Sequence, residues 1–155
     1  MHNLRKATID DAKLLFDWAN DCDVRATALI KKKIEWDEHI HWLTNKLHSN
    51  ESQIFILTDK NNENIGVVRF DQNNDAFVIS YSIDKLHRGK GMGYLLLQLG
   101  IKRILESESQ CKFVATVQTT NIASIKIFEK LGFKLEKKET VLGHIFNIYC
   151  KNGNE

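Results

Sequence analysis

The chain has 155 residues, of which 43% are hydrophobic and 27% are charged, and its formal net charge is +2. These values are ordinary for a globular protein, so we expect one domain over residues 1–155 that folds without disulfides. The small net charge excludes a bulk attraction to nucleic acid, and no apolar run approaches the roughly 20 residues of a membrane span.

Cysteine usage also limits the class of protein. Cys22, Cys111 and Cys150 lie too far apart for a metal-ligand motif, so we expect reduced thiols and no metal site. The first residues, Met-His-Asn-Leu, lack the basic and apolar layout of a signal peptide. These features predict a cytoplasmic protein with no membrane or nucleic-acid partner.

In chain order, residues 4–7 are expected to form a strand, and Thr8 is the expected N-cap of the next helix. Apolar residues at helical spacing predict helices over residues 12–19 and 36–47. Residues 22–35 have no clear period and predict a loop or a short irregular helix. Strands separated by turns rich in Asn and Asp are then expected over residues 53–58, 65–70 and 76–83.

The second half of the chain alternates between helices and strands. We expect helices over residues 94–105 and 123–131, and strands over residues 113–119, 134–141 and 145–150. The strands over 76–83 and 113–119 are joined through a helix, so they should run parallel with a right-handed crossover. The prediction is an α/β (α+β) fold with a mixed, mostly antiparallel sheet of about seven strands and about four helices.

The loop over residues 86–93 has the sequence Leu-His-Arg-Gly-Lys-Gly-Met-Gly. Its glycines leave backbone amides uncovered at a helix N-terminus, where unpaired N–H groups and the helix dipole favour anions. Arg88 and Lys90 add positive charge. The loop therefore predicts a phosphate cradle made by Leu86, Arg88, Gly89, Lys90, Gly91, Met92 and Gly93. The alternative is a tight turn without a ligand, because the spacing matches neither the P-loop nor the dinucleotide fingerprint.

A second polar segment begins about 30 residues after this loop. Asn121, Ser124 and Phe128 are spaced at i, i+3 and i+7, so they share one helix face if the helix begins near Asn121. A polar pair beside an aromatic ring predicts a wall for an amphiphilic ligand. In the alternative interpretation, Asn121 is only an N-cap and Phe128 belongs to the core.

The pattern Arg88-x-x-Gly91-x-Gly93, followed by the segment from Asn121 to Gly132-Phe133, resembles the GNAT acetyltransferase superfamily. The resemblance covers most of the chain. It implies acetyl-CoA as the cofactor, bound through its pyrophosphate to the amides of residues 88–93. It also implies that the parallel strands splay apart around the thioester, with strand-end amides near Ile83 holding the pantetheine.

The resemblance leaves the acid and the base of the reaction open. Many members carry a tyrosine where this chain has Phe128, so Ser124, Tyr81, water or solvent must protonate the leaving thiolate. The strand over 76–83 carries no carboxylate in its middle. The nearest acids are Asp71 and Asp75, which are otherwise ordinary turn residues. Ser124, Tyr81 and Asp71 are the candidate catalytic residues.

The segments over residues 16–25, 36–42 and 66–71 resemble amino-sugar-nucleotide N-acetyltransferases of pseudaminic-acid-type pathways. The implied acceptor is the primary amine of a UDP-linked 4-amino-4,6-dideoxy sugar, which attacks the thioester directly. The candidate acceptor contacts are Trp18, Asn20, His39, Arg69 and Asp71. His39 is expected either in the cleft or at the surface. The Arg69–Asp71 pair is likewise expected either to line the cleft or to form a surface ion pair. Trp36 is expected in the core.

Two alternatives remain open from the sequence. The segment after Asn121 also resembles ribosomal-protein acetyltransferases, which implies acetylation of a protein N-terminus. The missing tyrosine leaves room for a non-catalytic acyl-CoA-binding module. In the favoured interpretation the partner is a small-molecule acceptor, and the protein is a monomer or a homodimer.

Overall fold

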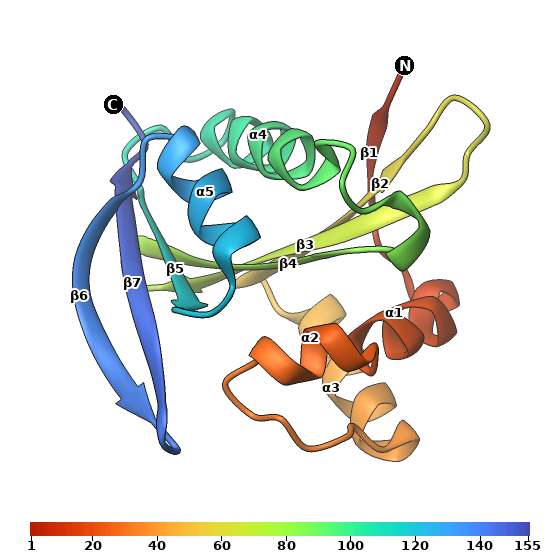
Figure 1. Cartoon of the computed structure of the whole chain (residues 1–155). Coiled ribbons are helices and arrows are strands. Elements are labelled where there is room, and N and C mark those ends of the chain that lie inside the picture. The colour runs from red at the N-terminus through yellow and green to blue at the C-terminus, as the bar shows by residue number, and fades with distance from the viewer.

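The computed structural model describes residues 1–155, and its centre is one sheet with the strand order β1-β2-β3-β4-β5-β7-β6 (Figure 1). Neighbouring strands are antiparallel except for β4 and β5, which are parallel. This arrangement confirms the predicted mixed sheet of seven strands. The strands are β1 (Asn3–Lys6), β2 (Ser52–Thr58), β3 (Asn64–Asn73), β4 (Ala76–Ile83), β5 (Lys112–Gln118), β6 (Lys134–Val141) and β7 (His144–Asn152).

Five α-helices flank the sheet, one more than expected, and none is long and apolar enough to cross a membrane. The additional helix, α2, lies in the segment whose sequence showed no clear period. It has only six residues, which are too few to display a helical period of apolar side chains. Its N-cap is Asp21, which accepts hydrogen bonds from the amides of Asp23 and Val24. The helices are α1 (Ala12–Ala19), α2 (Cys22–Thr27), α3 (Trp36–His48), α4 (Met92–Leu105) and α5 (Ile122–Lys130).

The alternation of side chains along β2 produces two hydrophobic cores, one on each face of the sheet. Phe55 and Leu57 belong to the larger core, which lies under α4 and α5. Ile54 and Ile56 belong to the smaller core, which packs against α1 and α3. Figure 1 shows α4 and α5 on one side of the sheet and α1, α2 and α3 on the other.

The parallel strands separate halfway along their length. They pair from Ala76 with Lys112 to Ile79 with Ala115. Beyond that point β4 continues beside β3, and β5 continues beside β7. A gap therefore opens between the C-terminal halves of β4 and β5, as the splayed pair in the prediction requires.

Candidate active site

A cavity of about 1180 Å³ is lined by the C-terminal halves of β4 and β5, by the glycine loop and by residues from all three layers of the fold. Its volume lies slightly above the usual range of about 300–1,000 Å³ for a small-molecule site. Most of the site residues predicted from the sequence line it together: Trp18, His39, Arg69, Tyr81, Ile83, Arg88, Gly89, Gly91, Met92, Gly93, Asn121, Ser124 and Phe128. The lining does not include Asn20, Asp71, Leu86 or Lys90.

The glycine loop has the backbone that a cradle requires. Gly89 and Gly91 adopt positive φ values of 75° and 78°, and a Cβ at either position would meet no atom within 4 Å. Gly91 is the N-cap of α4 and contributes no side-chain cap, so the first amides of this helix lack a side-chain acceptor. Gly93 has a different role, because a Cβ there would lie 2.9 Å from Ile127 Cδ1.

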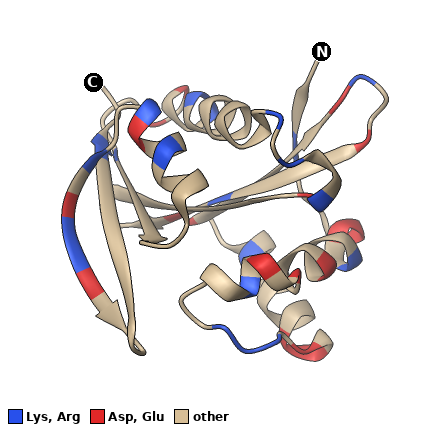
Figure 2. Cartoon of the chain, in the orientation of Figure 1, with Lys and Arg blue, Asp and Glu red and all other residues tan.

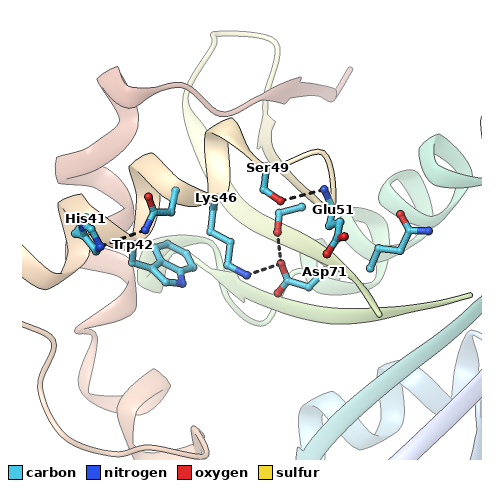
Figure 3. A pocket seen from close by; sticks show the side chains of 9 residues that line it. His41, Trp42, Lys46, Ser49, Glu51 and Asp71 are labelled. Carbon is cyan, nitrogen blue, oxygen red and sulfur yellow. Dashed lines mark hydrogen bonds and ion pairs between the residues drawn. The ribbon is translucent and has the colours of Figure 1, made fainter. Parts of the chain in front are cut away.

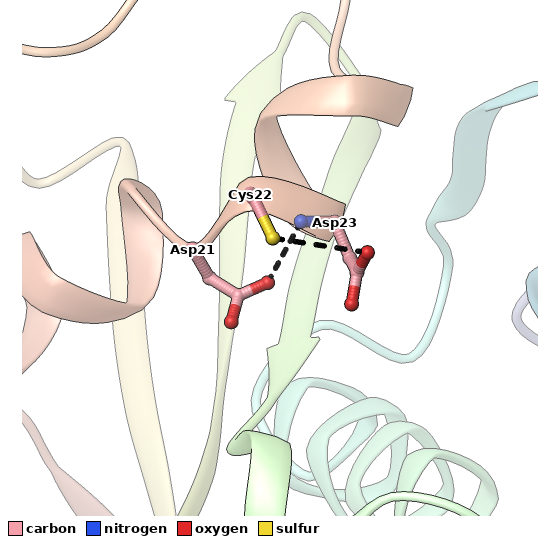
Figure 4. A group of neighbouring side chains, drawn as sticks. All are labelled: Asp21, Cys22 and Asp23. Carbon is pink, nitrogen blue, oxygen red and sulfur yellow. Dashed lines mark hydrogen bonds between the residues drawn. The ribbon is translucent and has the colours of Figure 1, made fainter.

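The cationic side chains of this loop are arranged differently from the prediction. Arg88 was expected to add its charge to the cradle, but it forms ion pairs with Asp21 at 3.1 Å and with Asp23 at 3.0 Å. Figure 4 shows the two carboxylates on either side of Cys22 at the start of α2. Lys90 is exposed, and its Nζ lies 3.4 Å from the carbonyl of Leu86.

Tyr81 on β4 and Ser124 on α5 meet at the wall of the cavity. Their hydroxyl oxygens lie 2.6 Å apart and share a hydrogen bond. Burial raises the pKa of Tyr81 above its ordinary value, although the bond to Ser124 opposes that shift. The phenol therefore stays protonated at neutral pH and carries a proton that it can donate.

Asn121 and Phe128 each fit both interpretations that the sequence left open, a structural role and a place in the cavity wall. Asn121 is the N-cap of α5 and accepts from the Ser124 amide at 3.3 Å, and it also lines the cavity. Phe128 is 2% exposed and packs edge-on against Tyr81, with a ring-centroid distance of 5.9 Å. It is a core residue that also forms part of the cavity wall.

His39 is buried at the cavity wall, which excludes the surface alternative. Its Nε2 lies 2.8 Å from the carbonyl oxygen of Ala12, and because a carbonyl only accepts, Nε2 carries the hydrogen. Burial lowers the pKa of His39, with the bond to Ala12 opposing, so the ring is neutral at neutral pH. Trp36 was expected in the core, but it begins α3 and is 41% exposed.

Asp71 lies outside the cavity, in a separate hollow of about 470 Å³ (Figure 3). Its carboxylate accepts from Lys46 at 3.0 Å, from Ser52 at 2.6 Å and from Arg69 at 2.7 Å. Burial alone would raise the pKa of Asp71, but these three donors outweigh burial and lower it. This geometry does not favour Asp71 as a general base, because the carboxylate is weakly basic and already saturated.

Two of the predicted acceptor contacts have their polar atoms engaged within the protein. The Trp18 indole nitrogen donates to Asp84 at 2.9 Å. The side-chain amide of Asn20 both donates to the carbonyl and accepts from the amide of Ile34. Asn20 therefore fixes the segment between α2 and α3, and Trp18 offers the cavity an apolar surface.

Two basic residues outside the predicted site, Arg25 and Lys31, line the cavity or bond to a residue that lines it. Arg25 on α2 lines it, and its guanidinium donates to the carbonyls of Ala19 and Ile30. Lys31 donates to Gln118 Oε1 at 2.7 Å, which joins the segment after α2 to the end of β5. Both residues come from the segment over residues 22–35, whose sequence shows no clear period, so their partners could not be predicted from spacing.

Residues 3–134 match the family model described as an acetyltransferase (GNAT) domain, so the chain belongs to the GNAT acetyltransferase family. The match confirms the resemblance that began at the glycine loop. Family membership identifies an acetyltransferase domain that uses acetyl-CoA as its cofactor. The open, amide-rich loop beside a large cavity suits the diphosphate of that coenzyme.

Among proteins of similar sequence, an uncharacterized protein of Methanocaldococcus jannaschii is 32% identical over 140 residues, covering 87% of this chain. The match spans only 28% of that relative's own length. Acetyltransferase PseH of Campylobacter jejuni is 24% identical over 145 residues, covering 94% of this chain and 90% of the relative.

Solved structures share the fold closely. A spermidine N-acetyltransferase of Vibrio cholerae, in complex with CoA and spermine, superposes with a TM-score of 0.89 at 17% identity, covering 98% of this chain and 95% of the other. A domain from Methanocaldococcus jannaschii gives a TM-score of 0.84 at 28% identity, covering 98% of each chain.

Proposed function

We propose that this protein transfers the acetyl group of acetyl-CoA to the primary amine of an amino sugar carried on a nucleotide. The observation that carries the choice of acceptor is the charge of the cavity wall. Its acceptor side includes Arg25, which has no carboxylate partner, and Arg69, which pairs with Asp71, whereas the lining carboxylates are Asp23 and Glu38. Asp23 is already paired with Arg88, and Glu38 is exposed.

This distribution of charge suits an anionic acceptor. Arg25 has no carboxylate partner, because its guanidinium bonds only to backbone carbonyls. Figure 2 shows further basic residues in the loop that follows α2, which contains three consecutive lysines. A nucleotide diphosphate would find compensating charge there. The similarity to acetyltransferase PseH, which covers nearly the whole chain, supports the same acceptor class.

A polyamine acceptor, as in the spermidine acetyltransferases of the same fold, would need the opposite surface. Several ammonium groups are held by carboxylates that are free to pair with them. In this cavity only Glu38 is a lining carboxylate without an ion-pair partner. The acceptor preference of those enzymes is therefore not carried over from the shared fold.

In the proposed complex, the coenzyme diphosphate contacts the amides over residues 88–93, and the thioester lies in the gap between β4 and β5. Ile83, Asn121, Ser124 and Phe128 would line the pantetheine arm, since all four face the cavity. Holding both reactants in this gap is the largest contribution to the rate, worth roughly 7–11 kcal/mol in well-oriented reactions.

The proposed chemistry is a direct attack on the thioester. The neutral amine nitrogen forms a bond to the acetyl carbon, the C–S bond breaks, and the attacking nitrogen loses a proton to solvent. The departing thiolate takes a proton from the Tyr81 hydroxyl, which is protonated at neutral pH and hydrogen-bonded to Ser124. His39, Trp18 and Arg69 would line the acceptor.

The test is release of free CoA thiol with three acceptors in parallel. We expect turnover with a UDP-linked 4-amino-4,6-dideoxy sugar and little with spermidine or with a peptide bearing a free α-amine. Faster turnover with spermidine or with the peptide would overturn the choice of acceptor. Calorimetry with CoA, run separately, reports whether the coenzyme site itself exists. Coenzyme binding without turnover of any amine would instead support an acyl-CoA-binding module.

A further inference from the structure

We propose that the side chain of Arg88 is a positioning residue that holds α2 at the acceptor side of the cavity, and that it is not a ligand of the coenzyme phosphates. Three of its nitrogens are already committed within the protein. Nε donates to the carbonyl of Ile83 at 3.0 Å, Nη1 contacts Asp23 at 3.0 Å, and Nη2 contacts Asp21 at 3.1 Å. A planar guanidinium fixed at three points is directed towards α2.

The Asp21 carboxylate, which pairs with Arg88, also has its hydrogen-bond partners within the protein. One carboxylate oxygen of Asp21 accepts from the amides of Asp23 and Val24 as the N-cap of α2, and it also pairs with Arg88. Burial alone would raise the pKa of Asp21, but Arg88 and the two amides outweigh it and lower that pKa. The carboxylate is therefore charged at neutral pH, and Arg88 meets a preformed anionic helix start.

The position of α2 depends on such polar contacts, because none of its residues is buried. It nevertheless supplies the cavity with Asp23, Val24, Arg25 and Thr27. The ion pairs of Arg88 join this weakly anchored helix to the end of β4 and to the start of the glycine loop. Loss of the ion pairs should displace the acceptor wall and leave the glycine-loop amides in place. The inference rests on the proposed function only in assigning α2 to the acceptor.

The two roles of Arg88 predict opposite signs for the same substitutions. If Arg88 bound the diphosphate, Asp21 and Asp23 would compete for it, and removing their charges would tighten coenzyme binding. If Arg88 positions α2, removing either side of the ion pair should weaken acceptor binding and leave the coenzyme unaffected. Asn is a good N-cap, so Asp21→Asn removes the charge and retains the cap.

The experiment compares Arg88→Gln, the double variant Asp21→Asn with Asp23→Asn, and the combination of all three. Lys85→Gln is the matched control, since it removes an exposed cation without an ion pair that lies just before the loop and does not line the cavity. Calorimetry gives the Kd of CoA, and initial rates give the acceptor KM. Thermal melting verifies that each variant is folded.

We expect Arg88→Gln and the double aspartate variant each to raise the acceptor KM about fivefold or more, within the usual range of coupling between sites. The triple variant should lose little further, because the partners act as one unit. The Kd of CoA should stay within about twofold of the wild-type value.

A Kd of CoA at least about tenfold weaker in Arg88→Gln, a tighter Kd in the double variant, or an unchanged acceptor KM would each overturn the proposal. The KM is measured with whichever amine the enzyme acetylates. A different acceptor would therefore contradict the proposed function and leave this test intact. The coenzyme measurement requires no acceptor.

Discussion

Tyr81 on β4 and Ser124 on α5 meet beside the gap that opens where β4 leaves β5, and their hydroxyls are 2.6 Å apart. Tyr81 is fixed in the sheet, and Ser124 lies one turn into α5. The bond therefore joins β4, which borders the gap, to α5, which follows β5 in the chain. Phe128, one turn further along α5, packs against the Tyr81 ring without a hydroxyl of its own.

Removing the phenolic hydroxyl tests its role as a proton donor. Tyr81→Phe should lower kcat about 10- to 100-fold, at or below the lower end of the range for general acid catalysis, because a thiolate is a tolerable leaving group. The Kd of CoA should change little, since the ring remains. Thiol release and calorimetry measure the two quantities. Tyr149→Phe is the control, because it removes a buried hydroxyl that does not line the cavity. Unchanged kcat in Tyr81→Phe would exclude this phenol as the donor.

Much of the fold was predictable because it depends on local pattern. The tight turns between β2, β3 and β4 and the helix between β4 and β5 specify which of these strands run antiparallel and which run parallel before any tertiary contact is known. The loop over residues 86–93 was predictable for the same reason, since positive φ at Gly89 and Gly91 is a local demand. The segment that contains α2 was predicted only as a loop or a short irregular helix, because its contacts involve Asp21 and Arg88, which lies 67 positions later in the chain.

Charge assignments at the site were the least predictable from sequence. Arg88 is a cation in a glycine loop, but its partners come from the N-terminal segment. Asp71 was a candidate general base because it is one of the acids nearest to β4 in the sequence. Lys46 of α3 and Ser52 of β2 nevertheless donate hydrogen bonds to its carboxylate. Each outcome depends on which distant donor or acceptor the fold brings near, and spacing along the chain does not contain that information.

The glycine loop can be tested with a pair of matched substitutions. Gly91→Val should abolish measurable binding of CoA, because its side chain would fill the open space at the start of α4 and a β-branched residue resists positive φ. Gly143→Val imposes the same backbone strain, since Gly143 also has positive φ and an open Cβ position, but it lies in the turn between β6 and β7. The Gly143→Val variant should lose some stability and keep its affinity for CoA. If calorimetry found equal losses of CoA affinity in both variants, the assignment of the glycine loop as the phosphate cradle would be contradicted.

The N-terminal strand and the first helix are joined by Asp11, whose carboxylate accepts from the Arg5 guanidinium at 2.8 and 2.9 Å and from the Thr8 amide at 2.8 Å. Asp11→Asn should lower the free energy of unfolding by about 1–2 kcal/mol, because the neutral amide loses the charged, two-bond pair with Arg5. Chemical denaturation at neutral pH measures it. The neighbouring Asp10→Asn, at an exposed carboxyl, should change little.

The same carboxylate makes a pH-dependent contribution with a defined sign. Burial alone would raise the pKa of Asp11, but Arg5 and the Thr8 amide outweigh it and lower that pKa. The folded state therefore releases this proton more readily than the unfolded state does. The resulting stability is present above the unfolded pKa of about 3.9 and is lost as pH falls through the folded value. In Asp11→Asn that part of the acid loss should be missing.

His39 makes a second pH-dependent contribution, in a higher window. Burial lowers its pKa below the ordinary value of about 6.5, so the folded protein favours the neutral ring and unfolding favours its protonation. Stability from this group is complete above about pH 6.5 and declines as the pH falls through the folded value.

The melting temperature of the wild type should therefore drop between about pH 7 and pH 5. His39→Gln, whose amide can still donate to the Ala12 carbonyl, should show a shallower drop. His41→Gln, at an exposed position of the same helix, should follow the wild type. Parallel curves for the wild type and His39→Gln would show that His39 does not titrate with unfolding.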